Sequence, residues 1–126
     1  TEVRAALSAA RSVAGGHKLH VLFQPHLFSR TREFAEEFAA ALNTADTALV
    51  LDIYPAREDP IPGVSSQLIA GHLGAGGRLV GPGAEAVQSV VSAAAPGDIV
   101  LTVGAGDVTA YGPLIVAALN DGAPGA

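Results

Sequence analysis

Apolar runs of strand length alternate along this chain with segments in which apolar residues recur at helical spacing. The run 47–53 is apolar almost throughout, and within 31–45 the residues Phe34, Phe38 and Leu42 recur every four positions. The first pattern is typical of a strand buried on both faces, and the second of a helix with one apolar side. Regular alternation of the two predicts an α/β fold, in which a parallel sheet with right-handed crossovers is flanked by helices.

The boundaries of the predicted elements follow from glycine and proline. Gly112-Pro113 is expected to break any helix that begins at Asp107, so the last helix is predicted to start at Pro113 itself. The apolar side of the first helix consists of Val3, Leu7, Ala10 and Ala14. The predicted helices are 1–14, 31–45, 67–73, 84–95 and 113–120, the predicted strands are 17–23, 47–53, 78–80 and 99–103, a proline-rich loop spans 54–66, and a frayed tail spans 121–126.

Composition excludes several classes of protein. The chain of 126 residues is long enough for one domain with its own core, and its 49% hydrophobic content suits a buried sheet. A net charge of −5 disfavours nucleic acid and anionic membranes as partners, because both select basic surfaces. Without cysteine the chain has neither disulfides nor thiolate metal sites. No apolar run is long enough to span a bilayer, so a cytoplasmic location is expected.

Three loops that follow predicted strands contain the candidate site residues. Ligands in open parallel sheets collect beyond the carboxyl ends of the strands, so these loops are expected to converge at one edge of the sheet. The candidates after the first strand are His26, Ser29 and Arg30, those after the second are Asp52, Tyr54 and Glu58, and those after the last are Gly104, Gly106 and Asp107.

Arg30 and Arg32 are unusual because they lie at the predicted start of a helix, which Ser29 or Thr31 is expected to cap. A helix N-terminus carries partial positive charge and disfavours cations. An anion bound at the helix start would explain both arginines. A pair between Arg32 and Glu36, one turn along the helix, is the structural alternative.

The other candidates also have structural alternatives. His26 can serve a turn, Asp52 can hold the N–H groups of the loop that follows it, and Tyr54 can cover the edge of the core. The turn 104–106 lacks the third glycine and the ribose-binding acid of a dinucleotide site, and tight turns between a strand and a helix use glycine anyway, so it is only a weak signal for a phosphate contact. His17, His20 and His72 have no metal-ligand spacing, and no metal site is predicted.

No string of the chain predicts catalysis by this domain alone. The phosphate-binding pattern G-x-x-x-x-G-K-[ST] is absent, and the single lysine, Lys18, precedes a strand rather than standing in a glycine loop. No nucleophile with an adjacent base stands out either. The chain also contains no methionine, so Thr1 is not expected to be a translation start and the chain is expected to be part of a longer protein.

Three strings carry a resemblance to a known family: FQPHLFSRTREF at 23–34, LDIYPAREDPIPG at 51–63 and VLTVGAGDV at 100–108. Together they resemble the C-terminal domain of the Mur ligases, the ATP-dependent enzymes of peptidoglycan precursor synthesis, over almost the whole chain. The related murein-recycling ligase has a Pro-Arg string at the first position, so His26 favours the branch that adds L-alanine. Another Mur-type amino-acid ligase, or a free-standing flavodoxin-like binding module, is the alternative.

The resemblance implies a fold, a reaction and a role for the candidate residues. The fold would be a Rossmann-like, mostly parallel sheet of about six strands. ATP and Mg²⁺, bound mainly by a central domain outside this chain, would activate UDP-N-acetylmuramate as an acyl phosphate for attack by L-alanine, and this domain would bind the amino acid and act as a lid. His26 and Arg30 would meet the carboxylate of L-alanine. Many members have Arg-Tyr where this chain has Leu27-Phe28, so one positive contact does not transfer.

Overall fold

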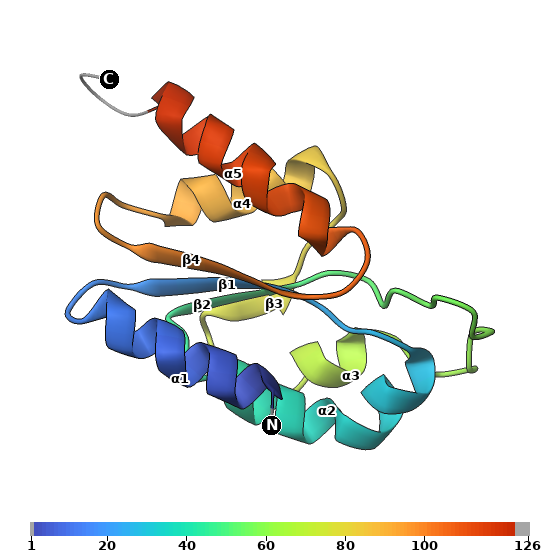
Figure 1. The fold of residues 1–126 in the computed structure, drawn as a ribbon. Helices are drawn as coiled ribbons and strands as arrows, with labels where there is room; N and C mark the ends of the chain where they lie inside the picture. The colour runs from blue at the N-terminus through green and yellow to red at the C-terminus, as the bar shows by residue number, and fades with distance from the viewer. Residues whose placement is uncertain (1, 123–126) are drawn as a thin grey trace.

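The computed structural model describes residues 2–122, which form a four-stranded parallel sheet between two layers of helices (Figure 1). The strand order is β3-β2-β1-β4. The strands are β1 (Leu19–Gln24), β2 (Thr47–Val50), β3 (Gly77–Leu79) and β4 (Ile99–Gly104), and the helices are α1 (Glu2–Ala14), α2 (Phe28–Leu42), α3 (Gln67–Ala70), α4 (Ala84–Ala93) and α5 (Val108–Gly122).

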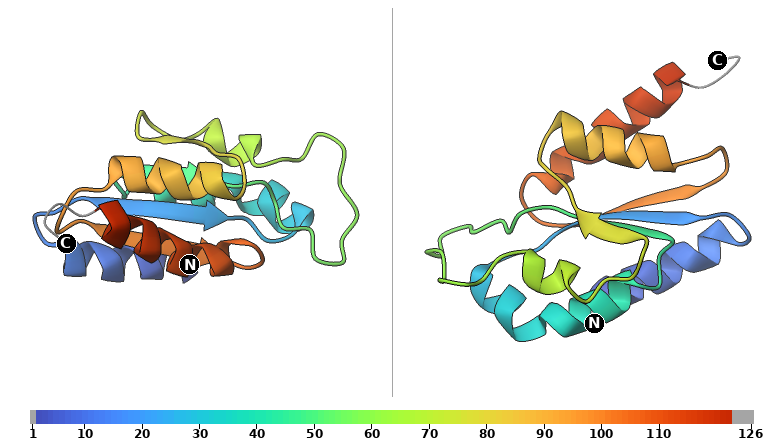
Figure 2. Two further views of the ribbon diagram at one scale, coloured as in Figure 1. Left: turned by 90° about the horizontal axis from the view of Figure 1, so that it is seen from above. Right: turned by 180° about the vertical axis from the view of Figure 1, so that it is seen from behind.

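The core consists of two apolar clusters, one on each face of the sheet. Figures 1 and 2 show α1, α2 and α3 on one face and α4 and α5 on the other. Alternate residues of the central strand β1 serve the two clusters: Val21 packs with α1 and α2, whereas Leu22 packs with α4 and α5. Every residue of β1 is buried, which explains its nearly continuous apolar sequence.

The α/β prediction is confirmed, and the apolar side predicted for the first helix is the buried side of α1. The expected number of about six strands is wrong for the part of the chain that the structure describes, which has four. The predictions for Thr1 and for 123–126 lie outside the described residues, whereas Asp121, expected in a frayed tail, belongs to α5. No helix within 2–122 is long and apolar enough to cross a bilayer.

The last helix is longer than predicted, because α5 begins at Val108 and continues through Pro113. Proline forfeits one backbone hydrogen bond inside a helix. Val108, Tyr111 and Ile115 are 1%, 8% and 2% exposed on the α4–α5 side of the sheet, and burial of these side chains outweighs the local preference.

A buried polar pair joins β1 to the turn before β4, at the edge of the sheet opposite the candidate loops. His20, expected on a strand or at the surface, is 2% exposed, and its Nε2 lies 2.9 Å from Oδ2 of Asp98. The same carboxylate accepts hydrogen bonds from the N–H groups of Ala95 and Lys18. The hydrogen bond with His20, followed by that with Ala95, lowers the pKa of Asp98 from 3.8 to about 2.

We expect this pair to set part of the acid sensitivity of the fold. A carboxyl group with a lowered folded pKa contributes stability above its unfolded pKa of 3.8, and that contribution is lost as the pH falls through about 2. The Asp98→Asn protein should therefore be less stable at neutral pH and lose less stability between these two values than the wild type. Urea unfolding at a series of pH values measures this, with the exposed Asp59→Asn as the control. Identical acid profiles for the wild type and Asp98→Asn would contradict the assignment.

Candidate functional site

The loops after β1 and β2 run side by side beyond the carboxyl edge of the sheet, and the segment 54–66 projects past the helices (Figure 2). The N–H of Tyr54 donates to the carbonyl of Pro25 over 2.8 Å, and the N–H of Leu27 donates to the carbonyl of Tyr54 over 3.0 Å. His26 therefore lies between two anchored residues, with its ring stacked on that of Tyr54 at a centroid distance of 6.1 Å. The predicted convergence of these two loops is confirmed.

A carboxylate from the second loop caps α2. Helix α2 begins after Leu27, with no side-chain cap on that residue and no acidic residue in the first turn. Glu58 Oε1 instead accepts the Ser29 N–H at 2.9 Å, and its Oε2 accepts the Ser29 hydroxyl at 2.5 Å. The prediction that Ser29 or Thr31 caps the helix is wrong, because α2 begins at Phe28 and both residues lie inside it. The Ser29 hydroxyl donates to Glu58, and the Thr31 hydroxyl donates to the Leu27 carbonyl. A carboxylate of the protein itself, Glu58, therefore occupies the start of α2, and the anion expected beside Arg30 remains a prediction.

The hydrogen bond from the Ser29 hydroxyl is the main cause of the lowered pKa of Glu58. The N–H groups of Ser29 and Phe28 and the charge of Arg32 lower this pKa by smaller amounts. The Glu58 carboxylate therefore stays ionised at neutral pH, and it stabilises the first turn of α2 electrostatically.

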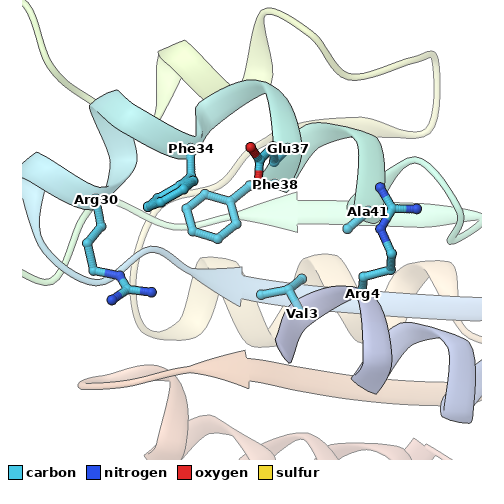
Figure 3. A pocket seen from close by; sticks show the side chains of 7 residues that line it. All are labelled: Val3, Arg4, Arg30, Phe34, Glu37, Phe38 and Ala41. Carbon is cyan, nitrogen blue, oxygen red and sulfur yellow. The ribbon is translucent and has the colours of Figure 1, made fainter. Parts of the chain in front are cut away.

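Arg30 lines two adjoining cavities. The larger, about 650 Å³, lies between α1, the end of β1 and β4, and both His26 and Gly104 line it. The smaller, about 270 Å³, lies between α1 and α2 (Figure 3). In Figure 3 the Arg30 side chain extends from α2 beside the rings of Phe34 and Phe38, and its guanidinium carbon lies 5.9 Å from the Phe34 ring centroid. Within 2–122 no carboxylate lies within ion-pair distance of Arg30.

Asp52, Tyr54 and Asp107 line a separate small cavity of about 160 Å³ beyond the ends of β1 and β2. Its floor includes Gln24, which the sequence analysis missed and which is 4% exposed. The Gln24 amide nitrogen donates to the Asp52 carbonyl at 3.2 Å, and its oxygen accepts the Val108 N–H at 2.9 Å. Gln24 thus ties the three loops together. A polar residue at the end of an apolar strand was the signal that could have found it.

The glycine that ends β4 and the glycine in the turn after it are required by packing inside the protein. A Cβ built on Gly104 would lie 2.3 Å from the carbonyl oxygen of Gln24, and one on Gly106 would lie 2.3 Å from the Tyr54 ring. Both glycines also have positive φ, of 125° and 85°. These contacts account for the two glycines, and the phosphate contact remains a prediction.

The structure therefore divides the nine candidates into three groups. His26, Arg30 and Gly104 share the larger cavity, whereas Asp52, Tyr54 and Asp107 share the small one. Ser29 and Glu58 are hydrogen-bonded to each other, and Gly106 lies against the Tyr54 ring.

Comparison with known proteins identifies the family. Residues 1–106 match the model of the family described as Mur ligase, glutamate ligase domain. The chain belongs to this family. It is 76% identical over 95% of its length to a UDP-N-acetylmuramate–L-alanine ligase of Paenarthrobacter aurescens, and 78% identical over 99% of its length to the protein of the same name from Arthrobacter sp. strain FB24. These matches take in 26% and 27% of the two relatives, so the chain spans about a quarter of their length.

A solved structure supports the same fold. A domain of a UDP-N-acetylmuramate:L-alanyl-gamma-D-glutamyl-medo-diaminopimelate ligase from Haemophilus ducreyi superposes with a TM-score of 0.68. The match covers 94% of this chain and 81% of that one, at 19% sequence identity. At this identity the similarity concerns the fold, and the Mur ligase C-terminal fold expected from the sequence is confirmed.

Proposed function

We propose that this chain is the amino-acid-binding and lid domain of an ATP-dependent ligase that joins L-alanine to UDP-N-acetylmuramate in peptidoglycan synthesis. The observation that carries the proposal is the 76–78% identity, over nearly the whole chain, to relatives named as that ligase. The proposal places the domain in the bacterial cytoplasm, in one chain with N-terminal and central domains.

In this proposal Arg30 binds the carboxylate of L-alanine in the larger cavity. A guanidinium presents two parallel N–H donors to a carboxylate, and no carboxylate of residues 2–122 competes for it. His26, which lines the same cavity, supplies a second polar contact. Asp52 and Tyr54, with the rest of the loop 52–63, contribute to the choice of amino acid, and Ser29 and Glu58 fix the helix that carries Arg30.

ATP and Mg²⁺ would supply the activation of the UDP-N-acetylmuramate carboxylate. Within 2–122 no three His, Cys, Asp or Glu side chains form a group that could hold a metal ion, and the sequence has no phosphate-binding loop. These residues do not fit a nucleotide–metal site of their own, and we assign that site to the central domain. Gly104, Gly106 and Asp107 would at most approach the nucleotide from the side of this domain when it closes. Closure of a lid excludes water from a reactive intermediate, which protects it from hydrolysis.

The proposal is tested with the full-length parent enzyme, a truncation that lacks residues 1–126, and this chain alone. We expect the parent to join UDP-N-acetylmuramate to L-alanine in preference to glycine, L-serine and D-glutamate. The truncated enzyme should still bind ATP but form no product, and this chain should fold yet neither hydrolyse ATP nor ligate. A parent that prefers D-glutamate, or steady ATP hydrolysis by this chain alone, would contradict the proposal.

A further inference from the structure

Two segments that are distant in sequence are fastened to each other at both ends. At one end the backbone of Tyr54 is hydrogen-bonded to Pro25 and Leu27, over 2.8 and 3.0 Å. At the other end both oxygens of the Glu58 carboxylate are bound to Ser29, one to its N–H and one to its hydroxyl. The segments 25–29 and 54–58 therefore form a closed unit, which we call the clamp.

The clamp holds a residue in a conformation that the local sequence does not favour. Leu27 has φ 70° and ψ 138°, which is a costly conformation for a residue with a side chain. Its N–H is held by the Tyr54 carbonyl, and its own carbonyl accepts both the N–H and the hydroxyl of Thr31. A strained residue persists only where its surroundings determine it from several sides, and the two ends of the clamp provide this.

The two ends of the clamp orient different candidate residues. His26 lies between the two residues that Tyr54 anchors through the backbone. Arg30 follows Ser29 directly in the first turn of α2. The direction of the Arg30 side chain therefore depends on the end of the clamp at which Glu58 binds Ser29. Loss of the Glu58 carboxylate would release the turn that carries Arg30 and leave the backbone anchors around His26 in place.

We propose that Glu58 is a positioning residue, which holds the first turn of α2 against the 54–58 segment and so directs Arg30 toward an anionic ligand that Glu58 itself does not touch. The identity of that ligand as the carboxylate of an amino acid rests on the proposed function. A carboxylate is poorly suited to contact another carboxylate, and both Glu58 oxygens are already engaged by Ser29.

The clamp itself is tested by NMR on this chain, independently of any ligase activity. Because Ser29 lowers the pKa of Glu58, the clamp should persist below the ordinary value of 4.5 and open only as the pH falls through the lowered folded value. The Ser29 amide and the Arg30 Nε–H resonances should report this opening together. Glu58→Gln should abolish the titration of both. Glu33→Gln is the matched control, because Glu33 is an exposed carboxylate on the same helix, without a hydrogen bond or ion pair in the described part of the chain. An unchanged titration in Glu58→Gln would overturn the clamp.

The positioning role is tested by kinetics of the full-length enzyme with L-alanine. Glu58→Gln should raise KM for L-alanine about tenfold with a smaller change in kcat, as expected for the loss of one charge-assisted contact. In the double variant with Arg30→Ala, the Glu58→Gln change should lower kcat/KM for L-alanine little further, because both changes remove the same contact. Multiplicative effects in the double variant would show that Glu58 acts independently of Arg30 and would overturn the role. Should the NMR result hold in an enzyme that prefers another amino acid, the proposed function fails and the clamp stands.

Discussion

Replacing Arg30 by alanine is expected to lower kcat/KM for L-alanine about 100-fold in the full-length enzyme, because a charged hydrogen bond left unmade costs about 1.5–3 kcal/mol and Arg30 can supply two. Folding stability should change little. Arg30 is exposed, and its one described interaction within the domain is the contact with the Phe34 ring, which at an exposed site is worth about 0.5–1 kcal/mol. Urea unfolding and alanine kinetics on the same variant separate the two effects.

Two further variants sharpen this experiment. Arg30→Lys should restore only part of the activity, since an ammonium group cannot present two parallel donors to a carboxylate. Arg78→Ala is the matched control, because Arg78 is an exposed arginine on β3, at the other edge of the sheet from β4. If Arg30→Ala lost stability but kept its alanine kinetics, Arg30 would be a structural residue and the proposed site would be wrong.

The sequence predicted the fold best where burial follows a regular period. The residues Val3, Leu7, Ala10 and Ala14 lie on one side of any helix, and they are the buried residues of α1. The prediction was less accurate where local preference and tertiary burial compete. In α5 the packing of Tyr111 and Ile115 outweighs the tendency of Gly112-Pro113 to break a helix. In α2 the alanines Ala35 and Ala39 are buried more deeply than Phe34, which was predicted to lie on the apolar side of the helix.

The candidate site was predictable as a place rather than as a set of contacts. Parallel strands bring their carboxyl ends to one edge, which is why the loops at 25–30, 52–58 and 104–107 meet there. The bond between Glu58 and Ser29 spans 29 residues and has no periodic signal, so the sequence could not show that the helix start was already occupied by a carboxylate. For Gln24 the sequence offers one signal, a polar residue at the end of an apolar strand, but it does not show the hydrogen bonds through which this side chain joins the loops.

Gly104 is the position where a single methyl group should damage both the fold and the site. It pairs with Gln24 across the β1–β4 register, and its φ of 125° is one that side chains rarely tolerate. A Cβ there would meet the Gln24 carbonyl oxygen at 2.3 Å, and a backbone atom in a central strand cannot rotate away as a side chain could. Conformational strain of this kind costs about 1–3 kcal/mol, and the displacement of β1 adds to it.

We therefore expect Gly104→Ala to lower the free energy of unfolding by about 3 kcal/mol or more. Gly63→Ala separates the two causes, because Gly63 also has positive φ, at 79°, but a Cβ there would meet nothing within 4 Å. The Gly63→Ala protein should lose only about 1 kcal/mol of its free energy of unfolding, which is the cost of the backbone conformation alone. Urea unfolding of both variants measures the difference, and equal losses would mean that β1 and β4 shift apart without cost. Since Gln24 also holds the Asp52 carbonyl and the Val108 N–H, a displaced Gln24 should disturb the resonances of both loops in Gly104→Ala and leave them unchanged in Gly63→Ala.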